Sequence, residues 1–315
     1  MPVACHDLPI TMSKGLHRFA VFVACATFFL IIAGANVTSH DAGLATSDWP
    51  LSNGQVFPKM VGNLFWEHGH RMVATVVGLL TIVLAVYVQA REKRRWVKRL
   101  AWGALAAVIA QGLLGGLTVK LNLPLIVSAA HATLAQLFFL ITVSLAVFTS
   151  PRWIAADSVS PATPEGPSLQ PMCVVSLIVI LTQLVLGATL RHSATWDQDL
   201  PTPLLVAHVC GAVVVTLVLG TTISFVLLRY RTEKYLTRPA IIAAVLLVVQ
   251  LALGLAAYIT RLRSPFDPQP LNPMIAVTVA HVSCGALVFA TTIVMTLRTF
   301  RLVRANGNEY GFAPA

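Results

Sequence analysis

Charged residues are scarce in this sequence. Asp, Glu, Lys and Arg make up 11% of its 315 residues, whereas hydrophobic residues make up 57% and the mean hydropathy is +0.78. Soluble domains carry about 25% charged residues, so this composition excludes an ordinary soluble domain. Acidic residues are the rarer charged type, 12 against 22 Lys and Arg, and almost all of them lie outside the apolar runs.

Cysteine is also sparse, and its placement excludes two further classes. No two of the five cysteines form a close pair in a connection between apolar runs, so the sequence offers neither a disulfide framework nor a zinc-type spacing. We expect them to act as small buried hydrophobic residues. They are Cys5, Cys25, Cys173, Cys210 and Cys284.

Long apolar runs dominate what is present. Each has roughly the 20 residues that a helix needs to cross a bilayer. Backbone amides cannot stay unpaired in lipid, and runs this long and uniform do not suit barrel strands. We therefore predict an all-α integral membrane protein with eight transmembrane helices. The runs lie near residues 16–36, 67–89, 98–118, 126–149, 171–190, 203–228, 238–260 and 273–297.

The net charge of +10 is placed asymmetrically along the chain. The side that holds both termini carries 16 of the 22 Lys and Arg residues, with the densest cluster at 91–99. By the positive-inside rule this side faces the cytoplasm. The pattern indicates contact with membrane lipid and argues against nucleic acid as a partner.

The odd-numbered runs end in a repeated pattern around a glycine. The first and fifth runs align as "LIIAGANVTSH" and "QLVLGATLRHS", and the third and seventh also end alike. We predict two pseudo-symmetric four-helix bundles, residues 1–150 and 171–315, joined by a cytoplasmic linker at 151–170. The aligned glycines are Gly34, Gly115, Gly187 and Gly254, and the last three follow a glutamine by four residues, namely Gln111, Gln183 and Gln250.

The even-numbered runs each contain one histidine in their outer half. Ionisable residues at membrane depth are costly and usually functional. A pair of imidazoles from two facing helices can hold a haem iron from both sides. We therefore predict that all four histidines are metal ligands, as two pairs. The pairs are His70 with His131 and His208 with His281.

Three alternative roles for these histidines compete with haem ligation. A zinc site needs three or four converging ligands, a proton relay uses histidine chains, and a lone histidine can simply join two helices. Small residues near the histidines, Gly211 and Gly285 among them, would leave room for a flat macrocycle or serve helix packing. We expect close helix packing at Gly112 and Gly116.

The four histidines differ in their surroundings. Only His70 has a carboxylate three residues before it and a guanidinium directly after it, Glu67 and Arg71. Residues i and i+3 share a helix face, so Glu67 is a candidate catalytic group beside whatever His70 binds. The alternative is a helix N-terminal acid that pairs with Arg71. His68 lies on nearly the opposite face and cannot bind the same iron.

These features together resemble the heme A synthase family. The resemblance rests on "EHGHR" at the start of the second run, the single histidines of the later even-numbered runs, and the outer loop "AGLATSDWPLSNGQVFP". It implies a bacterial-type plasma-membrane oxidoreductase that converts heme O to heme A for terminal cytochrome oxidases. It further implies a homo-oligomer that works beside heme O synthase and cytochrome oxidase assembly.

The resemblance also implies a role for each candidate residue. His70 and His131 would hold the substrate heme O, with Glu67 and Arg71 as further catalytic residues, and His208 and His281 would bind a resident haem b. Many relatives carry two cysteines where this chain has Thr46 and Ser52. Their absence puts any thiol-based redox step in doubt, and Asp48, Trp49 and Pro50 between them suggest a lid or a turn.

Two further functions remain open. A non-enzymatic bis-His cytochrome could transfer electrons to or from quinone, but it would not need the asymmetry created by Glu67. A transporter that uses the histidines as proton sites would require charged residues through the middle of the membrane. The acidic residues of this chain lie almost wholly in the connections.

Overall fold

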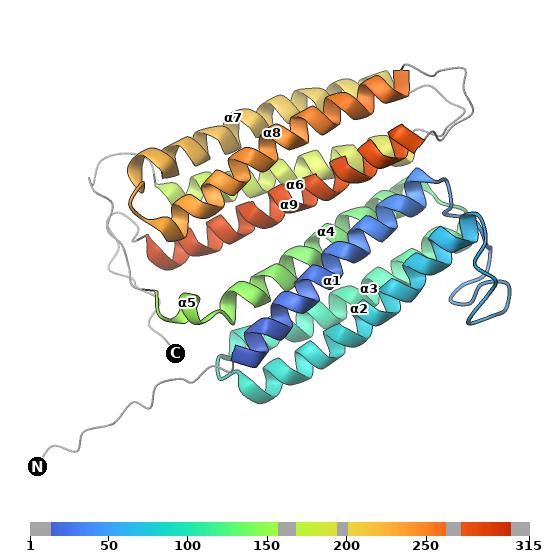
Figure 1. The fold of residues 1–315 in the computed structure, drawn as a ribbon, viewed down its shortest axis with the longest axis horizontal. Coiled ribbons are helices and arrows are strands. Elements are labelled where there is room, and N and C mark those ends of the chain that lie inside the picture. The colour runs from blue at the N-terminus through green and yellow to red at the C-terminus, as the bar shows by residue number, and fades with distance from the viewer. Residues whose placement is uncertain (1–13, 157–167, 194–200, 263–271, 304–315) are drawn as a thin grey trace, which may run out of the picture.

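The computed structural model of the chain describes residues 14–156, 168–193, 201–262 and 272–303. Within these ranges the chain is almost entirely helical (Figure 1). The helices are α1 (Lys14–Ser39), α2 (Asn63–Arg91), α3 (Arg95–Lys120), α4 (Leu125–Phe148), α5 (Pro151–Ile154), α6 (Leu169–Ser193), α7 (Thr202–Arg229), α8 (Lys234–Leu262) and α9 (Asn272–Leu302).

Eight of these helices are long and apolar enough to cross a membrane. Large apolar side chains such as Phe22, Leu79 and Leu217 are exposed on their outer faces, as lipid-facing surfaces require. The prediction of an all-α membrane protein with eight spans is therefore confirmed. Most of these helices extend beyond their apolar runs, because the backbone stays helical into the polar membrane interface, whereas α4 ends one residue before its expected run.

The long helices form two groups of four (Figure 1). In the first group α1 and α3 both pack against α2 and α4, and in the second α7 packs against α6 and α8 while α9 also packs against both. Separate apolar clusters fill the groups, around Leu84 and Phe138 in the first and around Leu219 and Met295 in the second. The division into domains at 150 and 171 stays a prediction, and residues 157–167 of the expected linker lie outside the described ranges.

The two groups meet through α1 and α4 of the first group and α6 and α9 of the second. Of these, α4 and α9 bury 44% of their most apolar window, against 17–28% for the other six spans. A small cluster that includes Phe139 and Ala286 fills the contact. Two guanidinium groups also cross it: Arg191 donates to the Thr38 carbonyl of α1 at 2.9 Å, and Arg301 donates to the Trp153 carbonyl at 3.2 Å. The first exploits the partial negative charge at the end of α1.

The cysteines follow the prediction only in part. Cys173 and Cys284 are buried, but Cys25 and Cys210 are exposed on the surfaces of their helices. Exposed positions in these spans face lipid, where a small apolar side chain costs little. Cys5 lies outside the described residues.

Candidate functional site

Each of the four predicted histidines lies against a glycine of the preceding long helix. A methyl group added to Gly115 or Gly187 would lie 2.9 Å from the nearest ring carbon of His131 or His208. The same construction on Gly34 and Gly254 gives 3.0 Å to the rings of His70 and His281. The glycine repeat and the histidine repeat are therefore two sides of one contact, because only glycine leaves room for the imidazole.

A glutamine one turn before the glycine reaches three of these histidines. The amide nitrogen Nε2 of Gln111 donates to the backbone carbonyl of His131 at 2.9 Å, and that of Gln183 donates to the carbonyl of His208 at 2.8 Å. Gln183 Nε2 also lies 3.1 Å from His208 Nδ1. In the fourth helix pair, Gln250 Nε2 lies 3.3 Å from His281 Nε2.

Two small residues that we assigned to macrocycle space or helix packing make room for these glutamines. A side chain at Gly211 would collide with the amide of Gln183, and one at Gly285 would lie 3.2 Å from Gln250 Nε2. The space beside both glycines is therefore already filled by an amide. Both the glutamines and the glycines can be recognised in the sequence, but their contact cannot, because it joins different helices.

The histidines of the second half form a pair suited to one iron. The ring centres of His208 and His281 are 6.4 Å apart and the ring planes differ by 72°. An imidazole nitrogen lies about 2 Å from its metal, with the ring centre ~1.1 Å behind it, so rings on opposite sides of one ion have centres roughly 6.2 Å apart. The pair therefore fits bis-histidine ligation.

Unpartnered ring nitrogens support the same fit in both halves. The Nδ1 atoms of His70, His131 and His281 are buried, and no hydrogen-bond partner lies within reach among the described residues. His131 also lies within electrostatic range of His70. No group of three or more His, Cys, Asp or Glu residues in the described ranges could hold a metal ion.

Glu67 is buried, with 4% of its surface exposed, and bonds in two directions. It forms an ion pair with Arg71, and its Oε2 accepts the backbone N–H of Thr46 at 3.0 Å. The predicted pairing with Arg71 is confirmed. The helix N-terminal alternative is wrong, because α2 begins at Asn63 and places Glu67 beyond the first turn.

Arg71 binds the outer loop in addition to Glu67. Its Nη1 donates to the carbonyls of Asp48 and Leu51 at 3.0 and 2.7 Å, and to Ser52 Oγ at 3.1 Å. The guanidinium therefore holds the catalytic candidate and the loop in one network. Arg presents several donors in a rigid plane, which suits such branching contacts.

His68 anchors the same loop from the same face of α2 as Arg71, and both side chains contact Ser52. Its Nε2–H donates to the Val56 carbonyl at 3.0 Å, so its Nδ1 accepts from the Ser52 hydroxyl at 2.9 Å. Ser52 is fully buried between His68 and Arg71. The expectation that His68 points away from the ligand His70 agrees with these contacts.

The loop closes on itself around Asp48. Asn53 and Gly54, with φ of 52° and 70°, form the tight turn that an Asn-Gly pair favours. The backbone N–H of Gly54 and the hydroxyl of Thr46 bond the carboxylate and hold the pKa of Asp48 well below its usual range. The carboxylate therefore stays ionised, and its contribution to loop stability is lost only in strong acid.

Trp49 fastens the loop to α3. A methyl group on Gly116 would lie 2.6 Å from the indole ring, whereas Gly112 has no atom within 4 Å of that position. Our expectation of helix packing at Gly112 and Gly116 is therefore wrong. Gly116 accommodates the indole, directly after the glycine that contacts His131, so the loop covers the outer end of the first half.

Gly116→Ala should loosen this loop. The added methyl group would displace the indole, and overpacking of this kind costs ~1–3 kcal/mol, so hydrogen exchange in residues 46–56 should accelerate roughly tenfold. Gly112→Ala is the matched control and should leave exchange unchanged. Equal exchange in both variants would show that Trp49 does not hold the loop.

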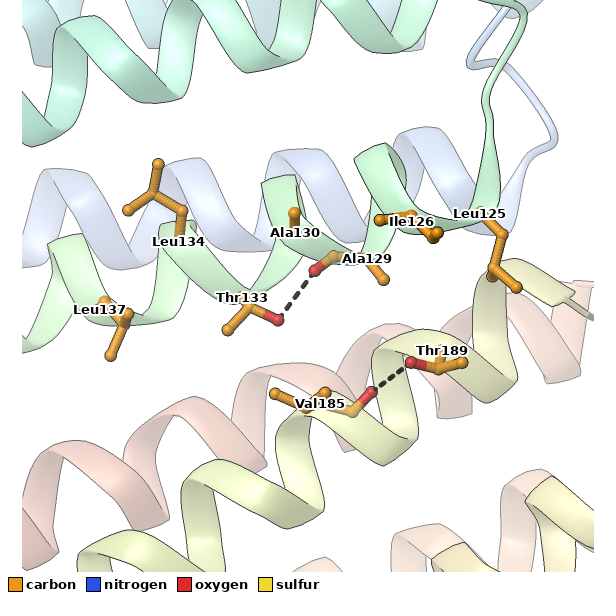
Figure 2. Close-up of a pocket in the computed structure, with 9 residues that line it drawn as sticks. All are labelled: Leu125, Ile126, Ala129, Ala130, Thr133, Leu134, Leu137, Val185 and Thr189. Atoms are coloured by element: carbon orange, nitrogen blue, oxygen red, sulfur yellow. Dashed lines mark hydrogen bonds between the residues drawn. The ribbon is translucent and has the colours of Figure 1, made fainter.

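A separate cavity of about 430 Å³ lies between the two halves. Figure 2 shows Ala129, Thr133 and Leu137 of α4 on the side that faces α6, where Val185 and Thr189 lie. The hydroxyl of Thr189 is turned back to its own helix, donating to the Val185 carbonyl at 2.8 Å, so the lining is apolar. None of the four histidines belongs to this lining.

Similarity to known proteins extends over most of the chain. Residues 59–198 match the COX15-CtaA family, described as a cytochrome oxidase assembly protein. The heme A synthase of Bacillus licheniformis is 24% identical over 271 residues, covering 80% of this chain and 88% of that protein. The heme A synthase of Geobacillus thermodenitrificans is 23% identical over 317 residues, with 92% and 94% covered. That of Symbiobacterium thermophilum is 33% identical over 187 residues, with 57% and 60% covered.

Proposed function

Because the chain belongs to the heme A synthase family, we propose that it oxidises a pyrrole methyl group of heme O to the formyl group of heme A. The observation that carries this proposal is the buried Glu67, one turn before a histidine with an unpartnered ring nitrogen. The other half has no carboxylate at the equivalent place. An asymmetry of this kind suits one reactive and one purely ligating site.

The two halves would divide the work. His70 and His131 hold the substrate heme O in the first half, and His208 and His281 hold a resident haem b in the second. The 6.4 Å separation of the His208 and His281 rings supports the second assignment. When bound, haem supplies a redox-active iron, and in the first half it also carries the methyl group that reacts.

Glu67 is the proposed catalytic base. Oxidation of a methyl group through an alcohol and a diol to an aldehyde takes up oxygen from water, passes electrons to an external acceptor and releases protons. A fixed carboxylate can accept these protons or stabilise positive charge that develops nearby. Arg71 and the Thr46 N–H hold the carboxylate in one position. Arg71 is thus a positioning residue, since its contacts are to Glu67 and the loop.

The loop that carries Thr46 and Ser52 serves as a cap. Its hydrogen bonds to Glu67, His68 and Arg71 tie it to α2, and Trp49 ties it to α3. A closed cap excludes bulk water from a reactive site. In this chain hydrogen bonds provide the closure at the two positions where many relatives have cysteines, so the mechanism uses no thiol step.

Several finer features belong to the same proposal. Both termini face the cytoplasm, because the basic residues gather at that end of the helices. The protein works as a homo-oligomer in a lipid membrane and exchanges haem with heme O synthase and the cytochrome oxidase assembly machinery. The multi-pass membrane location itself follows from the eight spans.

The direct test is conversion by the purified full-length chain. Membranes that contain the protein and a source of heme O should yield heme A, identified by the pyridine haemochrome spectrum of extracted haem. Bound haem with no conversion under any electron donor or acceptor would favour the bis-histidine cytochrome. A chain that purifies without haem would contradict both functions.

A further inference from the structure

We propose that Gln111, Gln183 and Gln250 are positioning residues for the haem-ligating histidines, and that the lack of a fourth glutamine makes His70 the exchangeable ligand. This inference rests on the proposed function. It assigns to the chain a device that distinguishes a resident haem from one that must enter and leave.

The spacing of glutamine and glycine along the helices is the first observation behind this proposal. In α3, α6 and α8 a glutamine lies one turn before the glycine that contacts a histidine, and its amide reaches that histidine. In α1 the corresponding residue, four before Gly34, is Leu30. Leu30 packs against the apolar cluster of the first half. In the part of the chain that the structure describes, His70 is therefore the one member of the four without such a glutamine contact, which we call a strap.

The hydrogen bonds of the glutamine amides are the second observation. An amide that donates to the backbone carbonyl of the ligand residue fixes two helices at the depth of the ligand. All three glutamines also have a buried Oε1 atom with no partner among the described residues. A metal-bound histidine normally donates its second ring N–H to a nearby acceptor, and rotation of the amide would bring Oε1 to the place where Nε2 now faces the rings of His208 and His281.

The distribution of these glutamine straps over the two halves is the third observation. In the second half both histidines are strapped, by Gln183 and Gln250, whereas in the first half only His131 is strapped, by Gln111. Partners of ligand residues typically change metal affinity 10- to 100-fold. The first half therefore releases haem faster, as a site for substrate and product requires, and the second half retains it.

Leu30→Gln tests the proposal by adding the missing strap. The full-length protein is loaded with heme O and haem b, and transfer of each haem to excess apomyoglobin is followed by its spectrum. We expect Leu30→Gln to slow heme O release about tenfold relative to the native chain, within the range for ligand partners. Leu30→Met, similar in size but without an amide, should release heme O at the native rate.

Gln250→Met provides the opposite change in the other half. It should accelerate haem b release at least about tenfold and leave heme O release unchanged. If Gln250 only stabilised the fold, Gln250→Met would accelerate the release of both haems. Faster release of haem b alone therefore indicates that Gln250 positions a ligand. Equal rates for Leu30→Gln and Leu30→Met, or loss of both haems from Gln250→Met, would overturn the proposal.

The outcome is independent of catalysis. Haem release is measured without turnover, so a chain that shows these rates but makes no heme A would contradict the proposed function alone. A chain that makes heme A but releases both haems at equal rates would contradict this inference alone.

Discussion

Glu67→Gln is expected to lower the conversion of heme O to heme A by about 100-fold or more, the usual contribution of a positioned acid or base. Glutamine has the same shape and its Oε1 can still accept the Thr46 N–H, so the cap should stay closed. What is lost is the negative charge and the ability to accept a proton. Haem extracted from the variant should contain heme O and haem b in native amounts with almost no heme A.

Glu92→Gln is the matched control for this variant. Glu92 lies between α2 and α3, is as buried as Glu67, and also pairs with an arginine, Arg94. Both substitutions remove one carboxylate from a buried ion pair and carry a similar cost in stability. Heme A formation should persist in Glu92→Gln. If Glu67→Gln also kept native turnover, Glu67 would serve only to anchor the loop.

Gly187→Val should remove haem b from the second half. Even a methyl group at Gly187 would lie 2.9 Å from the His208 ring, and valine adds further atoms at the same place, so the ring must move. Displacement of His208, the proposed ligand, should weaken haem binding by at least the 10- to 100-fold typical of changes around a ligand. The measurement is the haem b content of the purified protein, by pyridine haemochrome, per mole of chain.

Gly220→Val separates this effect from the cost of valine in a helix. Gly220 lies in α7 with no atom within 4 Å of an added methyl group, so the variant should keep its haem b. Heme O in the first half should remain bound in both variants. Native haem b content in Gly187→Val would mean that His208 is not a ligand in the orientation described.

The spans and the candidate histidines could be predicted from the sequence because their signals are local. An apolar run of some 20 residues is sufficient to indicate a transmembrane helix. The four histidines recur at the same depth, which made His70, His131, His208 and His281 visible as a set. Their role as metal ligands stays a prediction, supported by the buried ring nitrogens.

The contacts of the site could not be predicted, because they join residues that are distant along the chain. The glycine near the end of each odd-numbered run and the histidine in the run that follows are both visible, but nothing local indicates that Gly187 accommodates His208. Gly116 was misassigned for the same reason: its partner is Trp49, in a loop almost seventy positions earlier. Small residues in membrane helices usually serve helix packing, and here side chains from elsewhere occupy the space.

The two guanidinium bridges between the halves have a consequence for electron transfer. Arg191 joins the halves at the end where α1 finishes, and Arg301 joins them near α5 at the opposite end. Packed interfaces fixed in this way do not deform continuously. Electron tunnelling slows steeply with distance, so the helical frame would hold the two proposed haem sites at one constant separation.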